Sequence, residues 1–66
     1  MQAFNIKYRN ADDQTIKQET IFMGTLTGAK VSTAAFAPSG TESIVITNSL
    51  DLVVATERNG KWSKES

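Results

Sequence analysis

The sequence predicts a small α+β protein: a mainly antiparallel sheet of four to five strands with one helix packed on one face. Three observations predict this class. Short stretches of alternating or β-branched residues are separated by turn sequences, which is typical of hairpins. One central segment has the apolar content and the terminal proline of a helix. In the resulting β-β-α-β-β-β order, only the connection that holds the helix is long, so neighbouring strands are expected to be antiparallel.

The N-terminal segment predicts a hairpin. Apolar residues alternate with polar ones in the first strand, with the period of two that strands have; they are Phe4, Ile6 and Tyr8. Residues 10–13 (Asn-Ala-Asp-Asp) predict a turn, because Asn and Asp side chains bond to the nearby backbone. The following segment, Thr15–Met23, is rich in Thr and Ile and predicts the second strand.

Residues 25–37 predict the helix, which ends before Pro38 because proline disfavours helical geometry in the residue that precedes it. Thr25 or Thr27 is the expected N-cap. A glycine and several β-branched residues lower the intrinsic helix propensity of this segment. We therefore expect the helix to form by docking on the sheet.

The C-terminal half predicts three more strands. Residues 42–47 hold the run Ile-Val-Ile and are expected to form a strand, residues 48–51 a turn, and residues 52–57 the next strand. The sequence Asn59-Gly60 is a strong hairpin signal, because both residues tolerate the positive φ of a type I′ turn. A short last strand follows.

Loop lengths indicate which side chains share a face. A two-residue loop at the Asn-Gly sequence pairs Glu57 with Trp62, and the four-residue loop before it pairs Ile46 with Val53. The expected core face carries Ile44, Ile46, Val53, Ala55 and Trp62.

The opposite, outer face is expected to carry Val45, Leu52 and Val54, where a solvated sheet face would be polar. One interpretation is β propensity alone, since scattered apolar residues are common on surfaces. The other is a contact surface for a protein partner or for a second copy of the chain, as in a homodimer, because contiguous apolar patches mark interfaces.

A small nucleic-acid-binding module is the alternative hypothesis. The hairpin is expected to gather Lys7, Arg9 and Lys17 on its outer face, with Glu19 beside them. Basic sheet faces bind phosphate backbones. The formal net charge of zero, from seven basic and seven acidic residues, argues against this function.

Catalytic equipment is sparse in the sequence. The chain has no cysteine and no histidine, which excludes disulfides, thiolate zinc sites and imidazole bases. Residues 24–30 hold two glycines and a lysine but do not match a phosphate-binding loop. The adjacent carboxylates Asp12 and Asp13 lie in an expected turn rather than a pocket. We therefore expect a non-enzymatic binding or accessory protein with no cofactor and no metal.

Residues 1–66 are expected to form a single domain, with a C-terminal tail that frays from about residue 64. No apolar run approaches the roughly 20 residues of a membrane span, and the N-terminus does not have the pattern of a signal peptide. A domain of this size without disulfides is expected in a reducing compartment, and we expect the cytoplasm.

Overall fold

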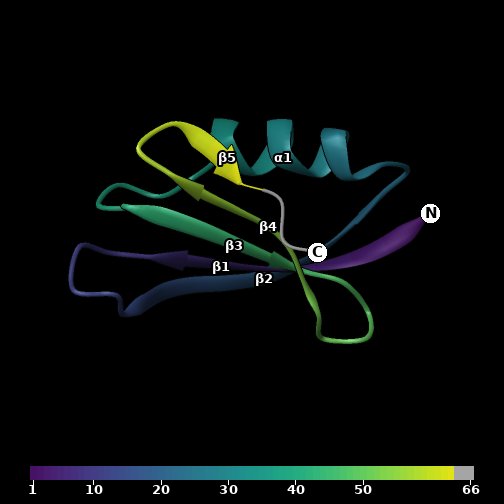
Figure 1. The fold of residues 1–66 in the computed structure, drawn as a ribbon, viewed down its shortest axis with the longest axis horizontal. Coiled ribbons are helices and arrows are strands. Elements are labelled where there is room, and N and C mark those ends of the chain that lie inside the picture. The colour runs from purple at the N-terminus through teal and green to yellow at the C-terminus, as the bar shows by residue number, and fades with distance from the viewer. Residues whose placement is uncertain (64–66) are drawn as a thin grey trace.

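The computed structural model describes residues 1–63, which form one five-stranded antiparallel sheet and one helix (Figure 1). The elements are β1 Gln2–Arg9, β2 Thr15–Met23, α1 Leu26–Ala35, β3 Ser43–Thr47, β4 Val53–Arg58 and β5 Lys61–Ser63. The predicted α+β class and the β-β-α-β-β-β order are confirmed. The expected frayed tail from residue 64 lies outside the described residues.

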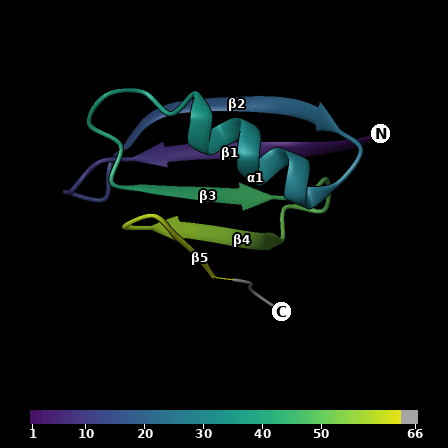
Figure 2. The same cartoon turned by 90° about the horizontal axis from the view of Figure 1, so that it is seen from above.

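The strand order across the sheet is β2-β1-β3-β4-β5. Strand β1 lies between β2 and β3 and is antiparallel to both. Helix α1 therefore carries the chain from one side of β1 to the other, and it passes over a single face of the sheet (Figure 2). The connections β1–β2, β3–β4 and β4–β5 join strands that are neighbours in the sheet.

Helix α1 begins at a threonine cap and docks through small side chains. The Thr25 hydroxyl oxygen accepts a hydrogen bond from the Gly28 backbone N–H at 3.0 Å. Ala29 and Thr33, one helical turn apart, are the buried residues of α1. The apolar core between helix and sheet consists of Phe4, Ile6, Tyr8, Ala29, Ile44, Ile46 and Ala55.

Two hairpin turns are built in the same way around an asparagine. The Asn10 side-chain oxygen accepts from two backbone N–H groups, at 2.9 and 3.0 Å, and the Asn48 side-chain oxygen does the same at 2.9 and 3.1 Å. Each turn holds an aspartate in the left-handed region, Asp13 with φ 63° and Asp51 with φ 66°. Asparagine thus fixes both turns through local bonds, as the sequence indicated.

The register of β3 with β4 differs from the one expected. Ile46 lies opposite Ala55, and a register shift then places Thr47 opposite Val53. The expected pairing of Ile46 with Val53 was wrong by two residues, because the loop before β4 includes Leu52 as a fifth residue and a β-bulge adds one more residue to β4. As a result Val53 is exposed and lies on the outer face, whereas Val54 is half-buried and packs against the core. The expected pairing of Glu57 with Trp62 is confirmed.

Candidate binding surface

The outer face is the side of the sheet opposite α1, and cross-strand pairing defines two rows on it. One row contains Lys7, Val45 and Thr56, which are successive partners on β1, β3 and β4. The other contains Arg9, Ser43, Arg58 and Lys61, on β1, β3, β4 and β5. Directly paired residues of antiparallel strands project from the same face, so each row forms a line of neighbouring side chains.

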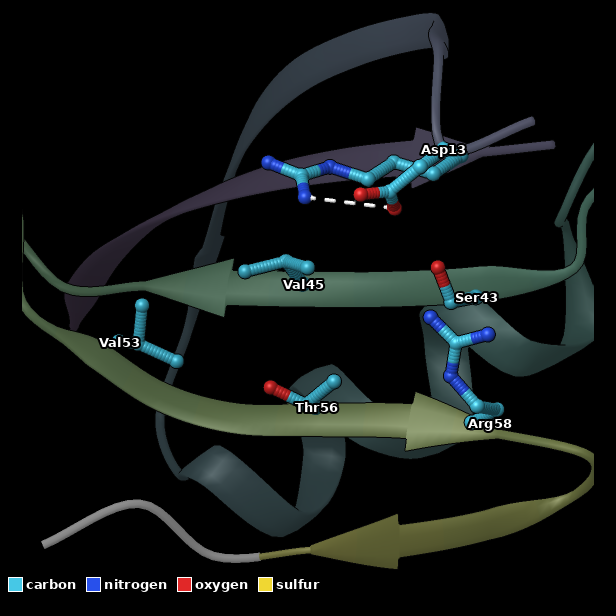
Figure 3. Close-up of a pocket in the computed structure, with 7 residues that line it drawn as sticks. Asp13, Ser43, Val45, Val53, Thr56 and Arg58 are labelled. Atoms are coloured by element: carbon cyan, nitrogen blue, oxygen red, sulfur yellow. Dashed lines mark ion pairs between the residues drawn. The ribbon is translucent and has the colours of Figure 1, made fainter. Parts of the chain in front are cut away.

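Five members of these rows, together with Asp13 and Val53, line a shallow, open hollow in the outer face (Figure 3). The hollow combines apolar, hydroxyl and charged side chains: Arg9, Asp13, Ser43, Val45, Val53, Thr56 and Arg58. Val45 and Val53 supply its apolar part, and Arg58 lies beside Ser43 at one end. Such a surface can receive a ligand that has both apolar and anionic parts.

The arginines of the hollow are held differently. The Arg9 guanidinium lies 3.6 Å from an Asp13 carboxylate oxygen, and this ion pair closes the turn between β1 and β2. Within residues 1–63 the Arg9 Nε is buried without a hydrogen-bond partner, so its guanidinium retains an unused donor. Arg58, at the end of β4, is exposed.

The structure does not bring the predicted apolar patch together. Val45 lies on the outer face as expected, but Val54 packs against the core. Leu52 precedes β4 and is 59% exposed at the end of the turn. The bulge in β4 brings Val53 to the same hollow as Val45 instead, so the apolar part of the hollow is this valine pair.

The predicted basic cluster is also only partly assembled. Lys7 and Arg9 lie on the outer face, but Lys17 lies opposite Tyr8 on the helix side of the sheet. Its Nζ is 5.9 Å from the centre of the Tyr8 ring and 3.9 Å from a Glu19 carboxylate oxygen. The expected position of Lys17 on the same face as Lys7 was wrong because β2 bulges at Ile16, and a shift of one residue exchanges the two faces.

Arg58 and Lys61 are cationic residues of this face that the sequence reasoning missed. The signal was present in the last hairpin. Since Glu57 pairs with Trp62 on the helix side, the next pair toward the turn must project to the outer face. That pair is Arg58 with Lys61.

Tyr8 and Glu19 form the main polar contact on the helix side of the sheet. The Tyr8 hydroxyl donates to a Glu19 carboxylate oxygen at 2.6 Å, while the rest of the tyrosine is fully buried. Burial, followed by the hydrogen bond to Glu19 and its charge, raises the pKa of the Tyr8 phenol well above its usual range. The phenol therefore stays protonated and acts as a hydrogen-bond donor within the fold.

Comparison of the chain with protein-family models, with curated proteins and with solved structures found no match. Among residues 1–63, no three side chains of the types His, Asp or Glu gather as they would to hold a metal ion. In the same part of the chain, no helix has the length and apolar character needed to cross a membrane.

Proposed function

We propose that this chain is a non-enzymatic binding protein that contacts a macromolecule through the outer face of its sheet. The supporting observation is that α1 covers one face, while the other presents valines and cations in a shared open hollow. A sheet with one uncovered face normally shows polar residues there. The Val45 and Val53 pair among cationic residues is better suited to a ligand than to water alone.

Single-stranded nucleic acid is the partner that the charges favour. Among residues 1–63, four cationic residues lie on the outer face, namely Lys7, Arg9, Arg58 and Lys61. The row from β1 to β5 that holds three of them crosses three strand spacings of about 4.8 Å, or roughly 14 Å. A polyanion that runs across the strands can meet these cations in succession, and each contact releases counterions from its phosphates.

An exposed aromatic ring supports a single strand over a duplex. Phe22 lies opposite Ala3 on the outer face and is 62% exposed. Unpaired bases stack on aromatic rings of this kind, whereas the bases of a duplex are already stacked on one another. The valines of the hollow offer a further apolar contact for a base.

The net charge of zero does not oppose this proposal once the charges are placed. Glu19 and Glu57 lie on the helix side of the sheet, opposite Ile6 and Ile44 respectively. Salt at physiological strength screens charges beyond about 8 Å. The charged residues that line the hollow itself are Arg9, Arg58 and Asp13, and Arg9 already binds Asp13.

The test is fluorescence anisotropy with a labelled single-stranded oligothymidylate over a series of salt concentrations. Four phosphate contacts predict a slope of log affinity against log salt of about −3, at about −0.7 per contact. The double variant Arg9→Gln/Arg58→Gln should reduce the slope to about −1.4. The control Lys30→Gln removes a positive charge from α1, on the helix side, and should leave the slope unchanged. Absence of binding at low salt, or equal effects of both variants, would refute the nucleic-acid proposal.

A protein partner, or a second copy of the chain, is the other candidate for this face, and the valine pair favours it. Val53→Lys distinguishes the two because the predicted effects have opposite signs. An added cation should strengthen binding of the oligonucleotide, by increasing the number of phosphate contacts. A buried unpaired charge should instead abolish a contact that depends on the valines, which a pull-down or a mass measurement would show.

A further inference from the structure

Strand β2 is an edge strand of the sheet, and its outer edge pairs with no other strand within residues 1–63. At nine residues it is longer than each of the other described strands, whereas β5, the strand at the opposite edge of the sheet, has three residues. All nine residues of β2 are exposed or half-buried, and Figure 2 shows the strand at the side of the sheet. A long edge strand offers a row of unpaired backbone N–H and C=O groups to which another strand can bind.

The features that usually protect an edge strand from pairing with another chain are weak in β2. It contains no proline and no glycine. Its bulge lies at Ile16, near its beginning, so the strand is regular from Lys17 to Met23. Charged side chains are the remaining protection, and β2 has two of opposite sign, Lys17 and Glu19.

These two charges make the β2 edge of one copy complementary to the β2 edge of a second copy. Lys17 and Glu19 flank Gln18 and lie on the same face of the sheet. If two copies pair in antiparallel orientation with Gln18 opposite Gln18, each Lys17 lies opposite Glu19 of the other copy. Shifting the register by two residues in either direction places Lys17 opposite Lys17 or Glu19 opposite Glu19. Shifts by one residue place side chains of opposite faces next to each other.

We propose that two copies of this chain associate through β2, in antiparallel register centred on Gln18. The two-fold axis then passes through the Gln18 pair and is perpendicular to the sheet, which becomes continuous across both copies. Both helices lie on one side of this sheet and both outer faces lie on the other. The proposal does not depend on the nucleic-acid function, because it rests on the edge strand β2 alone.

Such a dimer would nevertheless affect binding to the outer face. The two cationic hollows would point in the same direction across one continuous sheet. A ligand long enough to reach both would bind more tightly than a short one, since the second contact is intramolecular. An isologous dimer through the outer faces would instead hide both hollows.

The test is sedimentation equilibrium of the full chain from micromolar to near-millimolar concentration. We expect a monomer–dimer equilibrium. Lys17→Glu replaces two opposite-charge pairs with two like-charge pairs and should weaken the dimer about tenfold or more. The side chain of Lys17 is 48% exposed, so this change is compatible with the fold. Lys30→Glu, with the same change of charge on α1, should leave the dimer intact. Lys17→Glu/Glu19→Lys recreates the pairs in reverse and should restore it.

Hydrogen exchange on the unaltered chain gives a second measurement, because the double variant also removes the Tyr8–Glu19 bond. Amides of β2 that face outward should gain protection as concentration rises, while those of β5 should not. A chain that stays monomeric throughout, a dimer that is insensitive to Lys17→Glu, or protection gained elsewhere would overturn the proposal. Restored association together with protection along β2 would support it.

Discussion

The phenol of Tyr8 should make the stability of this fold fall in alkaline solution. Tyr8 is the one tyrosine of the chain, so its ionisation can be followed by absorbance without interference from another phenol. It is fully buried, donates to Glu19 at 2.6 Å, and has a raised pKa. Folding therefore favours the protonated phenol. Its contribution is complete below the unfolded-state pKa of about 10 and is lost as the pH rises above that value.

The size of this effect follows from linkage. While the folded phenol stays protonated, the free energy of unfolding falls by RT ln(1 + 10^(pH − 10)), which is about 1.4 kcal/mol at about pH 11. A domain of this length has a total stability of roughly 3–10 kcal/mol. The loss is thus a sizeable fraction of the whole. Tyr8→Phe cannot ionise, so the stability difference between it and the unaltered chain should shrink by the same amount.

The assay is urea denaturation of both proteins, followed by Trp62 fluorescence, at neutral pH and at about pH 11. At neutral pH, Tyr8→Phe should be less stable by about 1–2 kcal/mol, because it loses a hydrogen bond to a partly exposed carboxylate. Lysine deprotonation affects both proteins alike and cancels in the comparison. A folded-state phenol that titrates near pH 10, with a stability difference that does not change with pH, would show that Tyr8 is not held in its protonated form.

Two further pairs of variants test the turns and the bulge in the same denaturation assay. Asn48→Ala removes the acceptor for two backbone N–H groups and should cost about 1–2 kcal/mol, whereas Ser49→Ala in the same turn should cost almost nothing. Equal losses would mean that the asparagine does not fix the turn. Val54→Ala should cost about 1 kcal/mol because Val54 packs on the core, and Val53→Ala less than about 0.5 kcal/mol because Val53 is exposed. The reverse order would place the bulge elsewhere.

The elements of the fold could be predicted from local signals. Pro38 and the N-cap residue Thr25 bounded the helix to within about two residues at each end. The Asn-Gly sequence correctly predicted the last hairpin and the pairing of Glu57 with Trp62. The asparagines of the other two turns indicated where the chain reverses. Each of these signals acts through bonds between residues close in sequence, which is why the sequence reveals them.

The distribution of side chains between the two faces was decided by the tertiary structure. One inserted residue in β2 and one in β4 shift everything beyond them to the opposite face, and neither bulge has a local sequence signature. They moved Lys17 toward Tyr8 and exchanged Val53 with Val54. The candidate site changed accordingly, from an apolar patch to a mixed hollow with a cationic row. Bulges are set by how strands far apart in the chain pack together, so the sequence determined the elements and packing determined the surface.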